Sequence, residues 1–145
     1  MMELWPSIIL GLVGTGITIY YAWHSKKMAH DQMMKELFTE FNKRYDALNE
    51  HLEEIKINCK TIDDLKDNII LKNKLTDFFN LCAEEYFWHK KKRIDNEVWH
   101  AWESGMNDWY NQVKVIQLFW DEEFEKSKGI SYYIKSKNEF FKLRS

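Results

Sequence analysis

A run of residues without any charge, from Leu4 to Trp23, constrains the fold of this chain more than any other feature. An α-helix rises 1.5 Å per residue, so these twenty residues span about 30 Å, the thickness of the hydrocarbon core of a bilayer. Aromatic residues lie near both ends of the run, Trp5 at one and Tyr20 at the other, as in helices that end at the two lipid–water interfaces. The sequence therefore predicts a single N-terminal transmembrane helix, which we assign to residues 1–27.

A cleaved signal peptide is the alternative interpretation of this run. Signal peptides have a basic segment before a shorter apolar core, and small residues at the cleavage site. Here Glu3 precedes the run, and the basic residues Lys26 and Lys27 follow it. This order favours an uncleaved anchor, and the positive-inside rule places the N-terminus outside and the rest of the chain in the cytoplasm.

Small residues lie on one face of the predicted membrane helix. Ser7, Gly11, Thr15 and Thr18 are spaced by four, four and three residues, and Gly14 lies beside them. Such a stripe lets the backbones of two membrane helices approach closely, so it predicts self-association through this face. Glycine is also frequent in membrane helices in general, and a stripe without any interface is the alternative.

The rest of the chain, residues 28–145, has the composition of a helical domain. The sequence holds 5 glycines and 1 proline, and three of the glycines lie in the apolar run, so few helix breakers remain. Apolar side chains recur three or four residues apart, which is the period of an α-helix. They form three stripes: Met34, Phe38, Phe41, Tyr45, Leu48, Leu52 and Ile55; Leu71, Leu75, Phe78, Cys82 and Tyr86; and Trp99, Trp102, Met106, Trp109 and Val113. We predict an all-α fold in which the transmembrane helix is followed by a cytoplasmic bundle of four or five helices.

Local signals place the ends of several helices. No breaker separates the membrane segment from the first stripe, so one helix is expected to continue to about Ile57. Thr61 and Asp64 have the spacing of a capping box, and Asp95 is of the residue type that caps helices. The helix after Asp95 is expected to carry its apolar face on to Phe124.

The two glycines outside the apolar run receive different interpretations. Gly105 lies inside a predicted helix, where it indicates close approach of a partner helix. Gly129 is expected to end a helix, and Ser131 to start a last short one. That last helix would carry Tyr133, Phe140 and Phe141.

Two motifs give the chain a resemblance to a family of short bacterial proteins. Phe38, Phe41, Asn42, Arg44, Tyr45 and Leu48 match a motif F-x-x-F-N-x-R-Y-x-x-L within FTEFNKRYDALNEHL, residues 38–52. Glu85, Ile94, Asp95 and Trp99 match a second motif, E-x-x-x-x-x-x-G-x-I-D-x-x-x-W, within residues 83–106, but Lys92 stands in place of its glycine. The family consists of membrane-anchored helical proteins of unknown function, some described as phage abortive-infection proteins. The resemblance implies placement in the inner (cytoplasmic) membrane and a role in phage defence, and it implies no catalytic residues.

The motifs of common enzyme classes are missing from the sequence. It contains no P-loop, GxGxxG, HExxH or G-x-S-x-G, and its formal net charge of −2 argues against nucleic-acid binding. Cys59 and Cys82 lack the spacing of zinc ligands and are interpreted as free thiols. Glu97 and His100 form one E-x-x-H pair, whereas a di-iron bundle needs two. We predict a non-enzymatic protein without a metal or cofactor.

Two side-chain clusters are candidate binding sites, each with a structural alternative. Lys90, Lys91, Lys92 and Arg93 form either a solvated helix end or a site for an anionic ligand or lipid headgroup. Trp99, Trp102, Trp109 and Trp120 form either a helix core or an aromatic pocket.

Together these features predict a membrane-tethered interaction module. It would lie in the lipid bilayer, form a homo-oligomer through its anchor, and bind an unidentified protein partner. One alternative is an effector in which a ligand or signal rearranges clustered anchors and disrupts the membrane. A single helix with so few polar residues cannot line a pore alone, so this alternative requires oligomers. An uncharacterised enzyme is the third interpretation.

Overall fold

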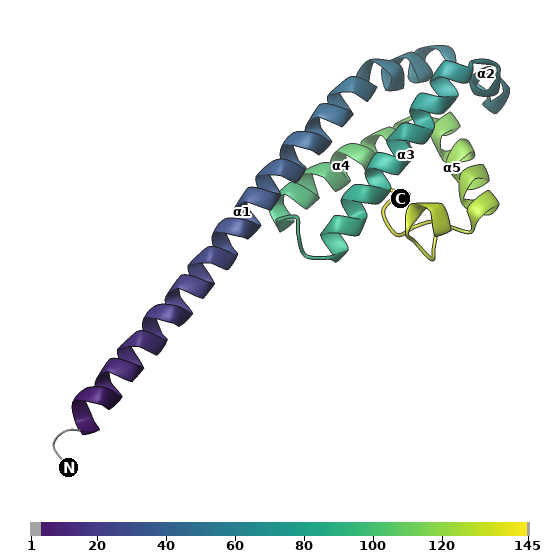
Figure 1. The fold of residues 1–145 in the computed structure, drawn as a ribbon. Helices are drawn as coiled ribbons and strands as arrows, with labels where there is room; N and C mark the ends of the chain where they lie inside the picture. The colour runs from purple at the N-terminus through teal and green to yellow at the C-terminus, as the bar shows by residue number, and fades with distance from the viewer. Residues whose placement is uncertain (1–3, 145) are drawn as a thin grey trace. The chain divides into compact units, whose positions relative to one another are not determined.

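The computed structural model describes residues 4–144, which form five α-helices and one turn of 3-10 helix, without any β-strand in this range (Figure 1). The elements are α1 (Leu4–Asn58), α2 (Ile62–Asp67), α3 (Ile69–Lys90), α4 (Asn96–Gln112), α5 (Lys114–Ser127) and η1 (Ile130–Tyr132). The predicted all-α fold class is thereby confirmed.

The chain divides into two compact units, Met1–Glu36 and Leu37–Ser145. The predicted anchor, residues 1–27, lies within the first unit, and the predicted cytoplasmic domain, residues 28–145, contains all of the second unit.

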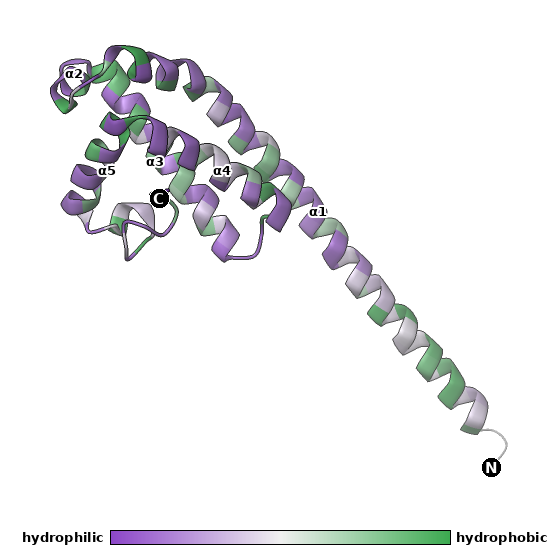
Figure 2. Cartoon of the chain, turned by 180° about the vertical axis from the view of Figure 1, so that it is seen from behind, coloured by the Kyte–Doolittle hydropathy of each residue, from purple (hydrophilic) through white to green (hydrophobic). Residues whose placement is uncertain are grey.

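The first unit contains the apolar run. α1 is the one helix in the described residues that is long and apolar enough to cross a membrane. None of its most apolar 18-residue window is buried within the protein, which excludes a role as the core helix of the described fold. Figure 2 shows the green, hydrophobic residues concentrated in this part of α1.

The first helix ends and the second begins where the sequence predicted. α1 ends at Asn58, and the capping box of α2 is complete. The Asp64 backbone N–H donates to Thr61 Oγ1 at 3.2 Å, and the Thr61 backbone N–H donates to Asp64 Oδ2 at 2.8 Å. These two bonds satisfy two of the backbone donors that a helix start leaves unpaired.

Of the two later boundaries, one differs from the prediction and one agrees with it. The helix after Asp95 does not reach Phe124, because α4 ends at Gln112 and α5 begins at Lys114 after an extended Val113. Gly129 follows the end of α5 as predicted, with a φ of +79°. A Cβ there would lie 2.6 Å from the backbone oxygen of Ile134, so only glycine fits this turn.

The predicted last helix is wrong. Only one turn, η1, follows Gly129, and Phe140 and Phe141 lie in an irregular segment beyond it. Their side chains are fully buried, so tertiary contacts rather than helical periodicity fix this part of the chain.

Aromatic rings fill the core of the second unit. Six rings from α3, α5 and the C-terminal segment are at most 1% exposed: Phe78, Phe79, Phe119, Trp120, Phe140 and Phe141. The centroid of the Phe79 ring lies 5.0 Å from that of Trp120 and 5.7 Å from that of Phe141. Edge-on pairs of this kind contribute about 0.5–1.5 kcal/mol beyond the burial of their area.

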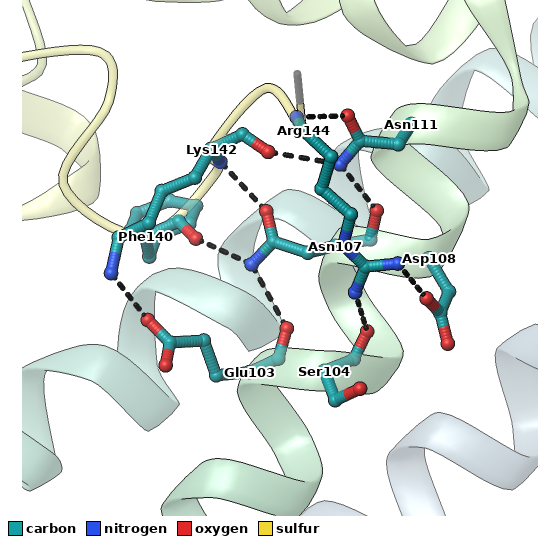
Figure 3. Close-up of polar contacts among 8 residues, drawn as sticks. All are labelled: Glu103, Ser104, Asn107, Asp108, Asn111, Phe140, Lys142 and Arg144. Carbon is teal, nitrogen blue, oxygen red and sulfur yellow. Dashed lines mark hydrogen bonds and ion pairs between the residues drawn. The ribbon is translucent and has the colours of Figure 1, made fainter.

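Two asparagines of α4 bind the backbone of the C-terminal segment (Figure 3). Asn107 donates to the carbonyl of Phe140 and accepts from the N–H of Lys142, while Asn111 donates to the carbonyl of Lys142 and accepts from the N–H of Arg144. Asn107 and Asn111 are four residues apart, which corresponds to a rise of about 6 Å along the helix. Two residues of extended chain span a similar length, about 6.6 Å, so the partners of Asn111 lie two residues further along the segment than those of Asn107.

Candidate functional site

The stripe of small residues on α1 is uncovered. Gly11 and Gly14 have no atom within 4 Å of where a Cβ would lie, apart from the backbone of α1 itself. Thr15 and Thr18 donate their hydroxyls to the carbonyls of Gly11 and Gly14, at 2.8 and 2.9 Å. Ser7, the remaining member, is also exposed. Because the threonine hydroxyls are bonded within the helix, they do not oppose contact with lipid or with a second helix.

The basic run does not form one cluster of free cations. Lys90 Nζ donates to the Tyr133 carbonyl at 2.9 Å and lies 4.6 Å from the centroid of the Tyr86 ring. Lys91 Nζ lies 5.6 Å from the centroid of the Phe87 ring. Lys92 and Arg93 are exposed in the turn after α3. The first member of the run is therefore engaged with the C-terminal segment.

The four tryptophans lie in different surroundings. Trp120 is fully buried in the aromatic core, and Trp99 is buried with His89 stacked on it at 4.4 Å. Trp109 is also buried, and its Nε1 donates to the Tyr45 hydroxyl at 2.8 Å. Trp102 lines a cavity.

This cavity lies between α1, α3 and α4 and has a volume of about 160 Å³. Its wall consists of Asn42 and Tyr45 from α1, Phe78, Leu81, Cys82 and Glu85 from α3, and Ala101, Trp102, Gly105 and Met106 from α4. Within each helix these residues are spaced by one, three or four positions, so each helix turns one face to the cavity. All of them belong to the second unit.

Gly105 leaves part of the cavity open. A Cβ built on this residue would meet no atom within 4 Å, apart from the backbone of α4. The prediction that Gly105 allows close approach of a partner helix is therefore wrong, because the missing side chain borders empty space.

Glu85 is the one acidic residue of the cavity wall. It is 6% exposed, and within residues 4–144 its carboxyl has no hydrogen-bond partner. The nearby Arg44 guanidinium donates two hydrogen bonds to Glu84 instead. Burial raises the pKa of Glu85 to about 8, since desolvation outweighs the attraction of Arg44.

The other ionisable groups of the wall stay neutral near pH 7. Burial raises the pKa of Cys82 well above its usual value, so its thiol carries its proton and is a poor nucleophile. Burial also raises the pKa of Tyr45. The cavity therefore offers apolar surface, neutral polar groups and one carboxyl.

Sequence reasoning did not find this site, although one signal was present. Glu85 lies three residues after Cys82 and seven after Phe78, on the buried stripe of α3. A charged residue at a core position is unusual unless it is paired, and this position could have been singled out. That α1 and α4 leave a cavity beside it is a tertiary feature without a local pattern.

No metal-binding cluster of three or more His, Cys, Asp or Glu side chains is found in the described residues. Comparisons with protein-family models, curated proteins and solved structures give no match to this chain. The resemblance to the abortive-infection family remains a prediction.

Proposed function

We propose that this protein is a membrane-tethered, non-enzymatic interaction module. A single N-terminal helix would anchor it, and residues 37–144 would form a helical bundle in the cytoplasm. The observation that carries this proposal is the exposure of the apolar part of α1. Large side chains there are more than half exposed over residues 4–28: Leu4, Trp5, Ile8, Ile9, Leu10, Leu12, Val13, Ile17, Ile19, Tyr20, Tyr21, Trp23 and Met28.

An apolar surface of this extent must be shielded from water. Soluble monomers rarely expose contiguous apolar patches above a few hundred Å², since the contact with water is unfavourable. A bilayer covers a helix on every side, and the run of about 30 Å matches its hydrocarbon core. Lys26 and Lys27 follow the run directly, which supports a cytoplasmic location for the larger unit.

Self-association of the anchor is part of the proposal. The stripe of Ser7, Gly11, Gly14, Thr15 and Thr18 presents no bulky side chain, and its threonine hydroxyls bond within the helix. These features support close contact of two copies in the membrane. A role in phage defence rests on the family resemblance alone.

Membrane fractionation tests the anchor. The full chain should sediment with membranes and stay there in high salt and in alkaline carbonate, because the binding energy is hydrophobic rather than ionic. Detergent should release it. Recovery of a shorter, soluble form outside the cytoplasm would show that the apolar run is a cleaved signal peptide.

A further inference from the structure

We propose that the cavity between α1, α3 and α4 binds a small organic cation, an alkylammonium about the size of butylammonium, through the carboxylate of Glu85. This inference goes beyond the proposed function and does not depend on it, because every residue of the cavity wall lies in the second unit.

The size of the cavity sets the size of the ligand. Its volume of about 160 Å³ resembles that of an engineered cavity of about 150 Å³ that binds benzene. Phe78, Leu81 and Met106 supply apolar walls, suited to an alkyl chain of a few carbons. Trp102 is only half-buried and offers a ring face that attracts a cation.

Glu85 sets the charge of the ligand. No hydrogen bond satisfies the Glu85 carboxyl within residues 4–144, and the residue lines the cavity, so an ammonium there would supply both hydrogen-bond donors and the opposite charge. Arg44 does not fill this role, because its guanidinium is bonded to Glu84. The cavity beside Glu85 has room for an ammonium that would pair with this carboxyl.

Binding should be coupled to proton release. With a pKa of about 8, Glu85 is mostly protonated at pH 7, and the ammonium binds the ionised form, so one proton passes from the carboxyl to the buffer. Arg44 and Tyr45 from α1 and Cys82 and Glu84 from α3 are the other ionisable groups nearby, and Asp108 of α4 acts on Tyr45.

These neighbouring groups do not account for the pH dependence of binding that is expected from Glu85. The raised pKa values of Tyr45 and Cys82 keep both groups neutral between pH 6 and 8, and Arg44 and Glu84 form an ion pair. The affinity for an alkylammonium should rise up to about tenfold per pH unit from pH 6 to 8, and level off above.

Isothermal titration of the full chain in detergent with butylammonium chloride tests the proposal. The wild type should show saturable binding in the millimolar range with release of a proton. Glu85→Gln, which keeps the shape but loses the charge, should weaken binding at least about tenfold. 1-Butanol, which matches the ligand in size but not in charge, should release no proton, and its affinity should not rise from pH 6 to 8.

A second pair of variants tests the location. Gly105→Leu should abolish binding, because the new side chain enters the cavity, whereas Ser104→Leu on the exposed side of α4 should leave it unchanged. Circular dichroism confirms that each variant is folded. The proposal is overturned if the wild type does not bind butylammonium, if Glu85→Gln binds it equally well, or if Gly105→Leu retains it.

Discussion

At the scale of single residues, Glu85 makes the stability of the fold depend on pH. Its pKa is about 8 in the folded chain and about 4.5 in its usual surroundings. Between these values the unfolded chain releases the proton while the folded chain retains it, so stability falls as pH rises from about 4.5 to 8. At 1.36 kcal/mol per pKa unit, the loss has an upper bound of about 5 kcal/mol.

Glu85→Gln should remove this dependence. The variant should resemble the wild type near pH 4.5 and exceed it in stability above pH 8, as measured by denaturant unfolding at several pH values. Asp64 and Glu139, whose lowered pKa values act in the opposite direction, are present in both proteins and cancel in the comparison. Parallel pH profiles would contradict the assignment of a raised pKa to Glu85.

Asn107 and Asn111 make the same kind of hydrogen bonds to the C-terminal segment, but they should contribute differently to the stability of the fold. Asn107 is 5% exposed and donates a hydrogen bond to the carbonyl of the fully buried Phe140. Asn107→Ala should cost about 1–3 kcal/mol, the penalty of a buried polar group without a partner. Asn111→Ala, whose partners are exposed, should cost less than about 1 kcal/mol. Denaturant unfolding measures both losses, and equal losses would contradict the larger contribution assigned to Asn107.

At the scale of elements, the anchor helix carries the prediction of self-association. Gly11→Ile places a β-branched side chain where two helices would touch, so it should abolish association of the anchor in a bacterial membrane two-hybrid assay. Leu12→Ile is the matched control, because Leu12 lies about 100° around the helix. Equal signals from the wild type and both variants would show that the small residues form no interface.

The elements also show which features were readable from sequence. The capping box of Thr61 and Asp64 and the turn at Gly129 are local devices, and both lie where the sequence placed them. The break between α4 and α5 at Val113 was not predictable in this way, because no glycine or proline marks it. The buried Phe140 and Phe141 are fixed by distant rings and by Asn107, so no periodicity in their own segment revealed their place.

The candidate site was also predictable from the sequence only in part. The stripes of α3 and α4 predicted which faces are buried, and Glu85 stands visibly on one of them. The cavity itself depends on Gly105 facing open space between three helices, which one sequence cannot show.

At the scale of the whole molecule, the proposed function requires the larger unit to lie in the cytoplasm and the apolar part of α1 to lie in the membrane. Labelling of a single exposed cysteine tests this most directly. Ile130 is 80% exposed, whereas Cys59 and Cys82 are 4% and 1% exposed and give little background. In bacterial spheroplasts that carry the Ile130→Cys variant, a membrane-impermeant maleimide should label the membrane-bound protein only after the cells are broken. Labelling in intact spheroplasts would place the unit outside, and recovery of the protein in the soluble fraction would refute the anchor.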